Sequence, residues 1–167
     1  IDMGVVPDAP ALLEAAFVQA GSKADAIITS GGVSVGEADH TRATMKTLGD
    51  VVFWRVAMRP GRPMAVGRIH APAPEFQVKL ASGAGNTGAS SYQNNSNSAT
   101  PPRSAILFGL PGNPVAVMVT FLAFVRPALL RMMGANAKPL PLLKATSLEP
   151  IRKKPGRTEY QRGILST

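Results

Sequence analysis

The sequence predicts an α/β fold in which a mostly parallel sheet is flanked by helices and followed by the start of a small β-barrel domain. Short apolar runs typical of strands alternate with longer runs of helical periodicity, which is the pattern of parallel sheets. Three loops rich in Gly and Pro follow expected strands, at 30–38, 59–63 and 110–114. Ligands of such sheets bind beyond the carboxyl ends of the strands, so these loops are the first candidates for a site.

The first half of the chain contains two expected helices. Apolar residues at helical spacing, with Pro10 in the first turn, predict a helix that Asp8 caps and Gly21 ends. A second helix is expected from about Asp39 to Leu48. Short runs rich in β-branched and apolar residues predict strands at 26–29, 51–58 and 64–69.

Residues 71–104 differ sharply in composition from the rest of the chain. They are rich in Ser, Asn, Gly, Ala and Pro and nearly lack large apolar side chains. Such a segment buries too little surface to offset the entropy that it loses on ordering. We therefore expect a flexible surface insertion.

The second half of the chain begins with an apolar strand at 105–110, followed by a loop and a long apolar helix that ends near Met133. Two further strands are expected at 142–148 and 158–165, joined by a basic turn. We therefore divide the chain into an α/β domain at 1–138 and the first strands of a β domain at 139–167.

Composition and charge narrow the classes of partner. With 45% hydrophobic residues the chain can bury a core, and its formal net charge of +8 favours anionic partners. Basic residues are spread along the chain and aromatic residues do not interleave with them, so no nucleic acid is expected. The longest apolar run, 115–125, is too short for a bilayer, so no membrane partner is expected. The absence of cysteine and of a signal peptide favours a cytoplasmic protein.

The loop at 30–38 combines glycines with serines. These residues can present backbone N–H groups and hydroxyls to an anion, helped by the N-terminal end of the following helix. The alternative is a tight connection from strand to helix in which Asp39 serves only as the N-cap. The candidate substrate-binding residues of this loop are Ser30, Gly31, Gly32, Ser34 and Gly36.

Two acids, Glu37 and Asp39, lie beside this anion-binding loop and are the candidate catalytic residues. A carboxylate repels an anion unless a cation lies between them, so we expect Asp39 to be the protein ligand of a Mg²⁺ ion that bridges carboxylate and phosphate oxygens. The alternative needs no metal, because an acid at the start of a helix is also stabilised by the helix dipole.

The loop at 59–63 carries two arginines, Arg59 and Arg62, on either side of Pro60 and Gly61. The prolines stiffen the loop, and a guanidinium group suits bidentate contact with an oxyanion. These four residues are therefore candidates for substrate binding. The alternative is an ordinary solvated turn.

The loop at 110–114 contributes Pro111, Gly112, Asn113 and Pro114 as further substrate-binding candidates. It leads into a helix and offers both N–H donors and a side-chain amide. The alternative is a rigid connection in which Asn113 caps the helix and Pro114 occupies its first position.

Taken together, these loops resemble the molybdopterin molybdenumtransferase family, which contains MoeA proteins and the E domain of gephyrin. Residues 29–39 (TSGGVSVGEAD) resemble its signature loop, 58–63 (MRPGRP) its second loop and 108–115 (FGLPGNPV) its third. Residues 4–8 (GVVPD) and 156–163 (GRTEYQRG) also match in the right order. The likeness is to the C-terminal part of these proteins, without their N-terminal regions.

The resemblance implies a MogA-like, molybdopterin-binding α/β domain followed by a β-barrel domain. It also implies a reaction in which adenylylated molybdopterin and molybdate give the molybdenum cofactor and AMP, with a divalent cation. Asp39 matches the family's essential acid. Ser34 and the backbone of Gly31 and Gly32 match the surroundings of the pterin phosphate and oxyanion. A homodimer is expected in the full-length parent.

The sequence departs from the family in three ways. Ala116 stands where the family usually has serine, and Arg59 and Arg62 stand where it usually has lysines. The chain also starts at a helix, without the preceding strand and its acidic loop, so the fragment alone could be inactive. Two other hypotheses stay open: a non-catalytic binding or scaffold module, and a small oxyanion or nucleotide sensor. Retention of Asp39 favours the enzyme, whereas Ala116 favours the scaffold.

Overall fold

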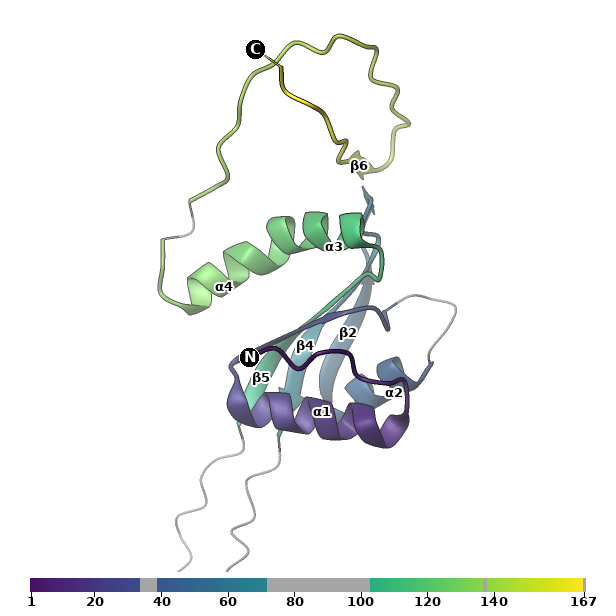
Figure 1. The fold of residues 1–167 in the computed structure, drawn as a ribbon, viewed down its shortest axis with the longest axis vertical. Helices are drawn as coiled ribbons and strands as arrows, with labels where there is room; N and C mark the ends of the chain where they lie inside the picture. Colours follow the sequence, from purple (N-terminus) through teal and green to yellow (C-terminus); the bar gives the residue numbers. More distant parts are fainter. Residues whose placement is uncertain (34–38, 72–102, 137, 167) are drawn as a thin grey trace, which may run out of the picture.

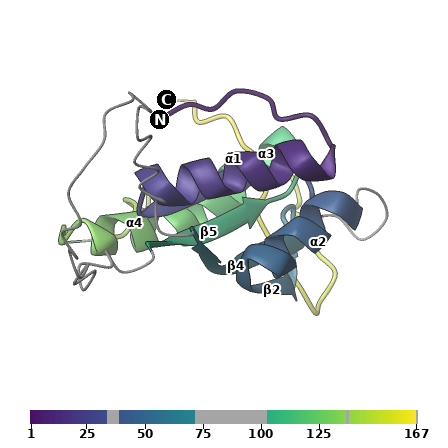
Figure 2. The same ribbon diagram turned by 90° about the horizontal axis from the view of Figure 1, so that it is seen from below.

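The computed structural model describes residues 1–33, 39–71, 103–136 and 138–166. In these residues a four-stranded sheet has helices on both faces (Figures 1 and 2), and a separate two-stranded pairing lies beyond one end of its strands (Figure 1). The helices are α1 (Pro10–Lys23), α2 (Asp39–Leu48), α3 (Pro114–Thr120) and α4 (Arg126–Met132), with a π-helical turn η1 (Phe121–Val125) between the last two. The strands are β1 (Ala26–Ser30), β2 (Gly49–Arg55), β3 (Met58–Arg59), β4 (Pro63–His70), β5 (Ser104–Leu110) and β6 (Thr158–Glu159).

The strands of the larger sheet follow the order β1-β5-β4-β2. β1 and β5 are parallel, whereas β4 is antiparallel to both β5 and β2. The prediction of a mostly parallel sheet is therefore wrong for the described strands, although the α/β class with flanking helices is confirmed. The reason is the link between β2 and β4, residues 56–62, because a parallel crossover needs a dozen or more residues.

The two reversals leave β1, β5 and β2 running in the same direction. Their carboxyl ends therefore lie at one edge of the sheet, where Ser30 is opposite Leu110 and Arg55 is opposite Pro63. The first and third loops start at this edge, and the second loop ends there at Pro63, even though the sheet is mixed.

Helices cover both faces of the sheet (Figures 1 and 2), and buried apolar side chains form one core layer on each face. On one face, Phe17 of α1 and Met45 of α2 pack on sheet residues that include Leu107. On the other, Val125 of η1 packs on sheet residues that include Phe108. Leu107 and Phe108 are neighbours on β5, so the alternation of side chains along a strand supplies both layers.

The start of α1 differs from the prediction. Its cap position is Ala9, which makes no side-chain cap hydrogen bond, and the helix continues past Gly21 to Lys23. Pro10 takes the first helical position, which moves the cap from Asp8 to the next residue. The Asp8 carboxylate instead accepts a hydrogen bond from the Thr41 hydroxyl at 3.3 Å, which links α1 to α2.

The helical run Pro114–Met132 is long and apolar enough, by length and composition alone, to cross a membrane. The expectation that the chain has no such segment is therefore wrong. The apolar run that was compared with a bilayer ended at Val125, before Arg126 and Pro127. The helix itself continues to Met132, close to its predicted end near Met133, because η1 widens the helix and α4 accepts the proline in its first turn. One such helix is weak evidence for a membrane, since core helices pass the same test.

In the described C-terminal residues, β6 is the one strand that forms, and it pairs in parallel with β3. Thr158 N–H donates to the Ala57 carbonyl and Tyr160 N–H donates to the Arg59 carbonyl, both at 2.8 Å. Residues 142–148 form no strand, so the predicted hairpin is wrong. A strand forms only where a partner offers its backbone, and β3 is the partner present. The domain boundary at 138 and the β-barrel stay predictions.

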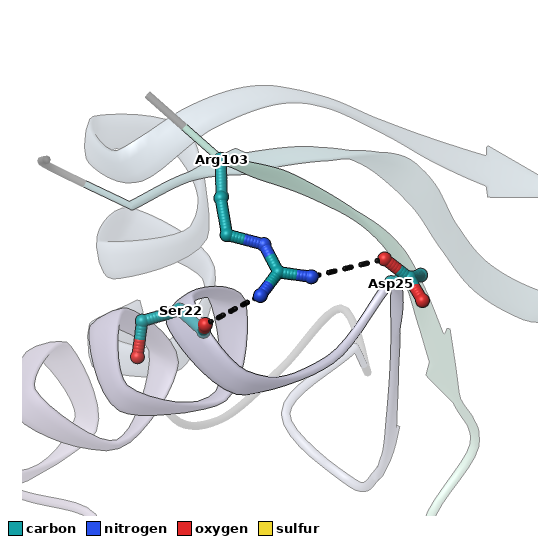
Figure 3. Close-up of polar contacts among 3 residues, drawn as sticks. All are labelled: Ser22, Asp25 and Arg103. Carbon is teal, nitrogen blue, oxygen red and sulfur yellow. Dashed lines mark hydrogen bonds and ion pairs between the residues drawn. The ribbon is translucent and has the colours of Figure 1, made fainter. Parts of the chain in front are cut away.

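The ends of the predicted insertion are held side by side. Ala71 N–H donates to the Arg103 carbonyl at 3.0 Å. Figure 3 shows the Arg103 guanidinium group donating to the Ser22 carbonyl at 3.2 Å and to the Asp25 carboxylate at 3.3 Å. Ala71 and Arg103 are thus part of the ordered contacts, and Ser104 begins β5, so these three residues do not belong to the predicted insertion. The rest of it, residues 72–102, lies outside the described residues.

We expect residues 72–102 to be dispensable for stability. Because their two ends are already joined, a short Gly/Ser linker replaces them without moving β4 or β5, and loop length changes closure entropy only slowly. The melting temperature should change by less than about 5 °C in calorimetry. A fall of more than about 10 °C would show that the segment packs on the core.

Candidate functional site

The first and third loops touch each other at the carboxyl edge of the sheet. Gly31 N–H donates to the Leu110 carbonyl at 3.0 Å. A Cβ atom placed on Gly112 would lie 3.7 Å from the Gly31 Cα atom, so the two glycine backbones are adjacent. The hydrogen bond also changes the predicted role of Gly31. Its amide anchors the loop and is not free for a ligand.

The first loop turns sharply after β1. Gly31 and Gly32 have φ angles of +92° and +68°, which side chains rarely tolerate. A Cβ atom on Gly32 would collide with the Thr41 side chain of α2. Val33 is buried, whereas Ser30 is exposed at the end of β1. The loop is thus held between the sheet and α2, with Ser30 facing outward.

Several predicted residues of this loop cannot be placed. Ser34, Gly36 and Glu37 lie outside the described residues. Asp39 is the first residue of α2, so it lies in the helix and not at the cap before it, but its side chain is also outside the description. Among the described residues, no group of three or more His, Asp or Glu could hold a metal ion. The Mg²⁺ prediction therefore stays untested.

The second loop presents two arginines to solvent. Arg59 ends β3 and Arg62 precedes β4, and both are exposed. Neither forms an ion pair with another described residue. Gly61 between them is buried, and the Arg62 carbonyl accepts a hydrogen bond from Val56 N–H at 2.8 Å. The loop backbone is fixed while its two guanidinium groups are available to an anion.

The third loop caps a helix. The Asn113 side-chain oxygen accepts hydrogen bonds from Val115 N–H at 3.0 Å and Ala116 N–H at 3.2 Å, and Pro114 is in the first turn of α3. The alternative that made Asn113 a cap is confirmed. Its oxygen is therefore engaged, which leaves the amide NH₂ group as the part of Asn113 that can reach a ligand. Gly112 is exposed beside it, whereas Pro111 is buried.

Comparison with known proteins decides the family. Residues 1–131 match the family described as "Probable molybdopterin binding domain". The chain belongs to this molybdopterin-binding family.

Named relatives of this molybdopterin-binding domain are longer proteins. The molybdopterin molybdenumtransferase of Haemophilus influenzae is 37% identical over 98% of the chain and 33% of the relative. Gephyrin of Dictyostelium discoideum is 32% identical over 96% of the chain and 21% of the relative. The chain thus spans a third or less of these curated relatives.

A solved structure is also similar. The molybdopterin biosynthesis MoeA protein from Pyrococcus horikosii superposes with a TM-score of 0.51 at 27% identity, covering 79% of this chain and 24% of that one. The likeness supports the α/β fold with its helix-flanked sheet.

A cavity of about 950 Å³ adjoins the first loop of the molybdopterin-binding domain. It lies between the N-terminal segment, α1 and β1, and its lining includes Ser30, Gly32 and Thr41. No residue of the second or third loop is among its described lining. The cavity therefore borders one loop of the predicted site and does not coincide with the site.

Three residues near the loops of the molybdopterin-binding domain were missed by sequence reasoning. Thr29 Oγ1 is buried beneath the first loop and has no hydrogen-bond partner among the described residues. Glu159 of β6 lies opposite Arg59, because β6 pairs with β3. Thr120 is fully buried beside the second loop. Thr29 is an ordinary strand residue by pattern, and the other two depend on contacts between distant segments.

Proposed function

We propose that this domain binds adenylylated molybdopterin and molybdate and takes part in the transfer of molybdate to the pterin, with release of AMP. The observation that carries the proposal is the meeting of three loops at one edge of the sheet in a chain of the molybdopterin-binding family. The names of its relatives concern molybdopterin molybdenumtransferases, which supports a place in molybdenum cofactor biosynthesis.

The chemistry of the edge suits an anionic substrate. Arg59 and Arg62 are two exposed cations on a fixed backbone, and such groups can bind phosphate or molybdate oxygens in pairs. Uncharged hydrogen-bond donors can add to these contacts: the backbone N–H groups of Gly32 and Gly112 and the side-chain NH₂ group of Asn113. We assign substrate binding to this edge, where the hydrogen bond from Gly31 to Leu110 keeps the first and third loops together.

We extend the proposal to Asp39 and Glu37 as acids that the reaction requires. Asp39 begins α2 directly after the first loop. A carboxylate there is a suitable ligand for Mg²⁺, but the described residues include no group able to complete such a site. We therefore assign no step to a metal ion and restrict the proposal to the need for an acid at this position.

The arginine pair offers a direct test of substrate binding. We expect the double substitution Arg59→Gln and Arg62→Gln to weaken molybdopterin binding at least about tenfold in calorimetric titration, because each charged hydrogen bond contributes on the order of 1.5–3 kcal/mol. The loss should shrink at high salt, since the contact is electrostatic and exposed.

The matched control removes the same charge elsewhere. Arg68 of β4 and Arg131 of α4 are exposed and lie outside the three loops. Replacing both with Gln should leave the affinity within about twofold of wild type at moderate salt. Equal affinities in the two double variants would contradict the placement of the site.

A second candidate function is a non-catalytic binding or scaffold module. Ala116 favours it, because this residue is 4% exposed and supplies no hydroxyl where a serine was expected. Such a module would bind the pterin without releasing AMP.

We also expect a homodimer, for which exposed apolar side chains such as Met118 and Leu122 on the helical run provide a candidate contact face.

A further inference from the structure

Thr120 is the only polar side chain that is fully buried among the described residues. It is the last residue of α3, about two turns after the Asn113 cap. Its hydroxyl donates to the Ala116 carbonyl at 2.7 Å and lies 3.1 Å from the Val117 carbonyl. These bonds fix the rotamer of the side chain and satisfy its one donor inside the helix.

The methyl group of Thr120 faces the second loop. A Cβ atom placed on Gly61 would lie 2.6 Å from Thr120 Cγ2 and 3.6 Å from the Ala116 carbonyl oxygen. Gly61 is buried and has a φ angle of +99°, so its backbone is pressed against α3 in a conformation that only glycine adopts readily. Gly61 lies between Arg59 and Arg62, whose guanidinium groups are exposed.

We infer that Thr120 is a positioning residue that holds the second loop against α3. Because the third loop caps α3, this contact fixes the position of the second loop relative to the third. The inference rests on the proposed function, in which both loops contact the same substrate. The relative position of the two loops then decides whether both can bind that substrate at once. The methyl group is the surface on which Gly61 rests, and the hydroxyl bonds inside α3 satisfy the buried polar group without taking part in that contact.

The two halves of the side chain can be separated by substitution. Thr120→Ser keeps the hydroxyl and removes the methyl contact with Gly61. Thr120→Val keeps a branched side chain, which is stiff in a helix, and removes the hydroxyl. If the methyl group carries the effect, the serine variant should loosen the second loop, and the valine variant should restore its order towards wild type.

Amide hydrogen exchange measures this loosening without any ligand. In Thr120→Ser, exchange of the Val56 amide, which donates to the Arg62 carbonyl at 2.8 Å, should be faster by about tenfold, while exchange in β5 stays unchanged. Thr47→Ser is the matched control, because Thr47 makes the same kind of bond to the Ala43 carbonyl at 3.1 Å but lies on α2. It should leave the exchange of the second loop unaltered.

Melting of a second pair of variants tests the same contact. Gly61→Ala should be strongly destabilising by itself, and part of that loss should be recovered when Thr120→Ser is added, because the serine removes the atom that the new Cβ would meet. Strictly additive losses would overturn the inference, as would equal loosening of the loop in Thr120→Ser and Thr120→Val.

Titration of the whole chain with sodium molybdate links the inference to function. Thr120→Ser should weaken molybdate binding by about fivefold relative to Thr47→Ser. If wild type binds no molybdate, the binding proposal is wrong, while the exchange and melting results still decide the contact. If wild type binds and both serine variants match it, the positioning role is wrong and the proposed function stands.

Discussion

Molybdopterin binding should be lost when Gly32 is replaced by valine, with affinity lower by about 100-fold or more in calorimetric titration. A Cβ atom at this position collides with the Thr41 side chain, and the φ angle of +68° is unfavourable for any β-branched residue. The first loop must therefore leave its place between the sheet and α2. Its movement would also break the hydrogen bond from Gly31 to Leu110, which joins the first and third loops.

Gly134 provides a matched control for backbone strain. It has a φ angle of +72°, nearly that of Gly32, but a Cβ atom there would meet nothing within 4 Å. Gly134→Val should therefore cost only the strain of the left-handed conformation, on the order of 1–2 kcal/mol of stability, and leave binding unchanged. If Gly134→Val impaired binding as much as Gly32→Val, the effect would be general destabilisation and the first loop would not be part of the site.

Asp39→Asn should reduce molybdate-dependent AMP release by about 100-fold or more while the protein stays folded. Asparagine has the same shape as aspartate and is tolerated at the start of a helix, so the lost dipole interaction costs only about 0.3–1 kcal/mol. What asparagine lacks is the negative charge, which is the property that we propose the reaction requires at this position. The assay belongs in the complete polypeptide that carries these residues, with melting recorded for each variant.

Asp50→Asn is the appropriate control for Asp39→Asn. Asp50 is an exposed acid of β2 that pairs with His70 at 3.5 Å, on the part of β2 away from the three loops. Its substitution changes the net charge equally and should leave AMP release unaltered. Near-normal activity of Asp39→Asn would mean that the acid only stabilises α2, and the catalytic proposal for this position would be withdrawn.

Local patterns in the sequence predicted most of the elements that build the site. Asn113 followed by Pro114 is a helix-start signal, and the structure confirms the cap with two hydrogen bonds. The glycines at 31 and 32 indicated a turn that needs positive φ, and both adopt it. Such features depend on residues adjacent in the chain, so sequence alone contains the information.

Strand direction was within reach of the sequence but was assigned wrongly. The regular alternation of strands and helices suggested parallel strands, yet residues 56–62 are too few for the crossover that a parallel pair requires. A stricter use of connection length would have predicted the β2–β4 hairpin. The predicted hairpin of 142–148 with 158–165 was wrong for a different reason, since the strand that pairs with β6 is β3, which lies far away in the sequence.

The sequence by itself determined the α/β class, the three loops and the residue types that suit an anionic substrate. Only the tertiary structure decided that the Gly31 amide is used by Leu110, that β6 pairs with β3 and that Thr120 supports Gly61. Each of these is a contact between segments distant in the chain. Their partners are set by strand order and helix packing, which no local pattern of residues encodes.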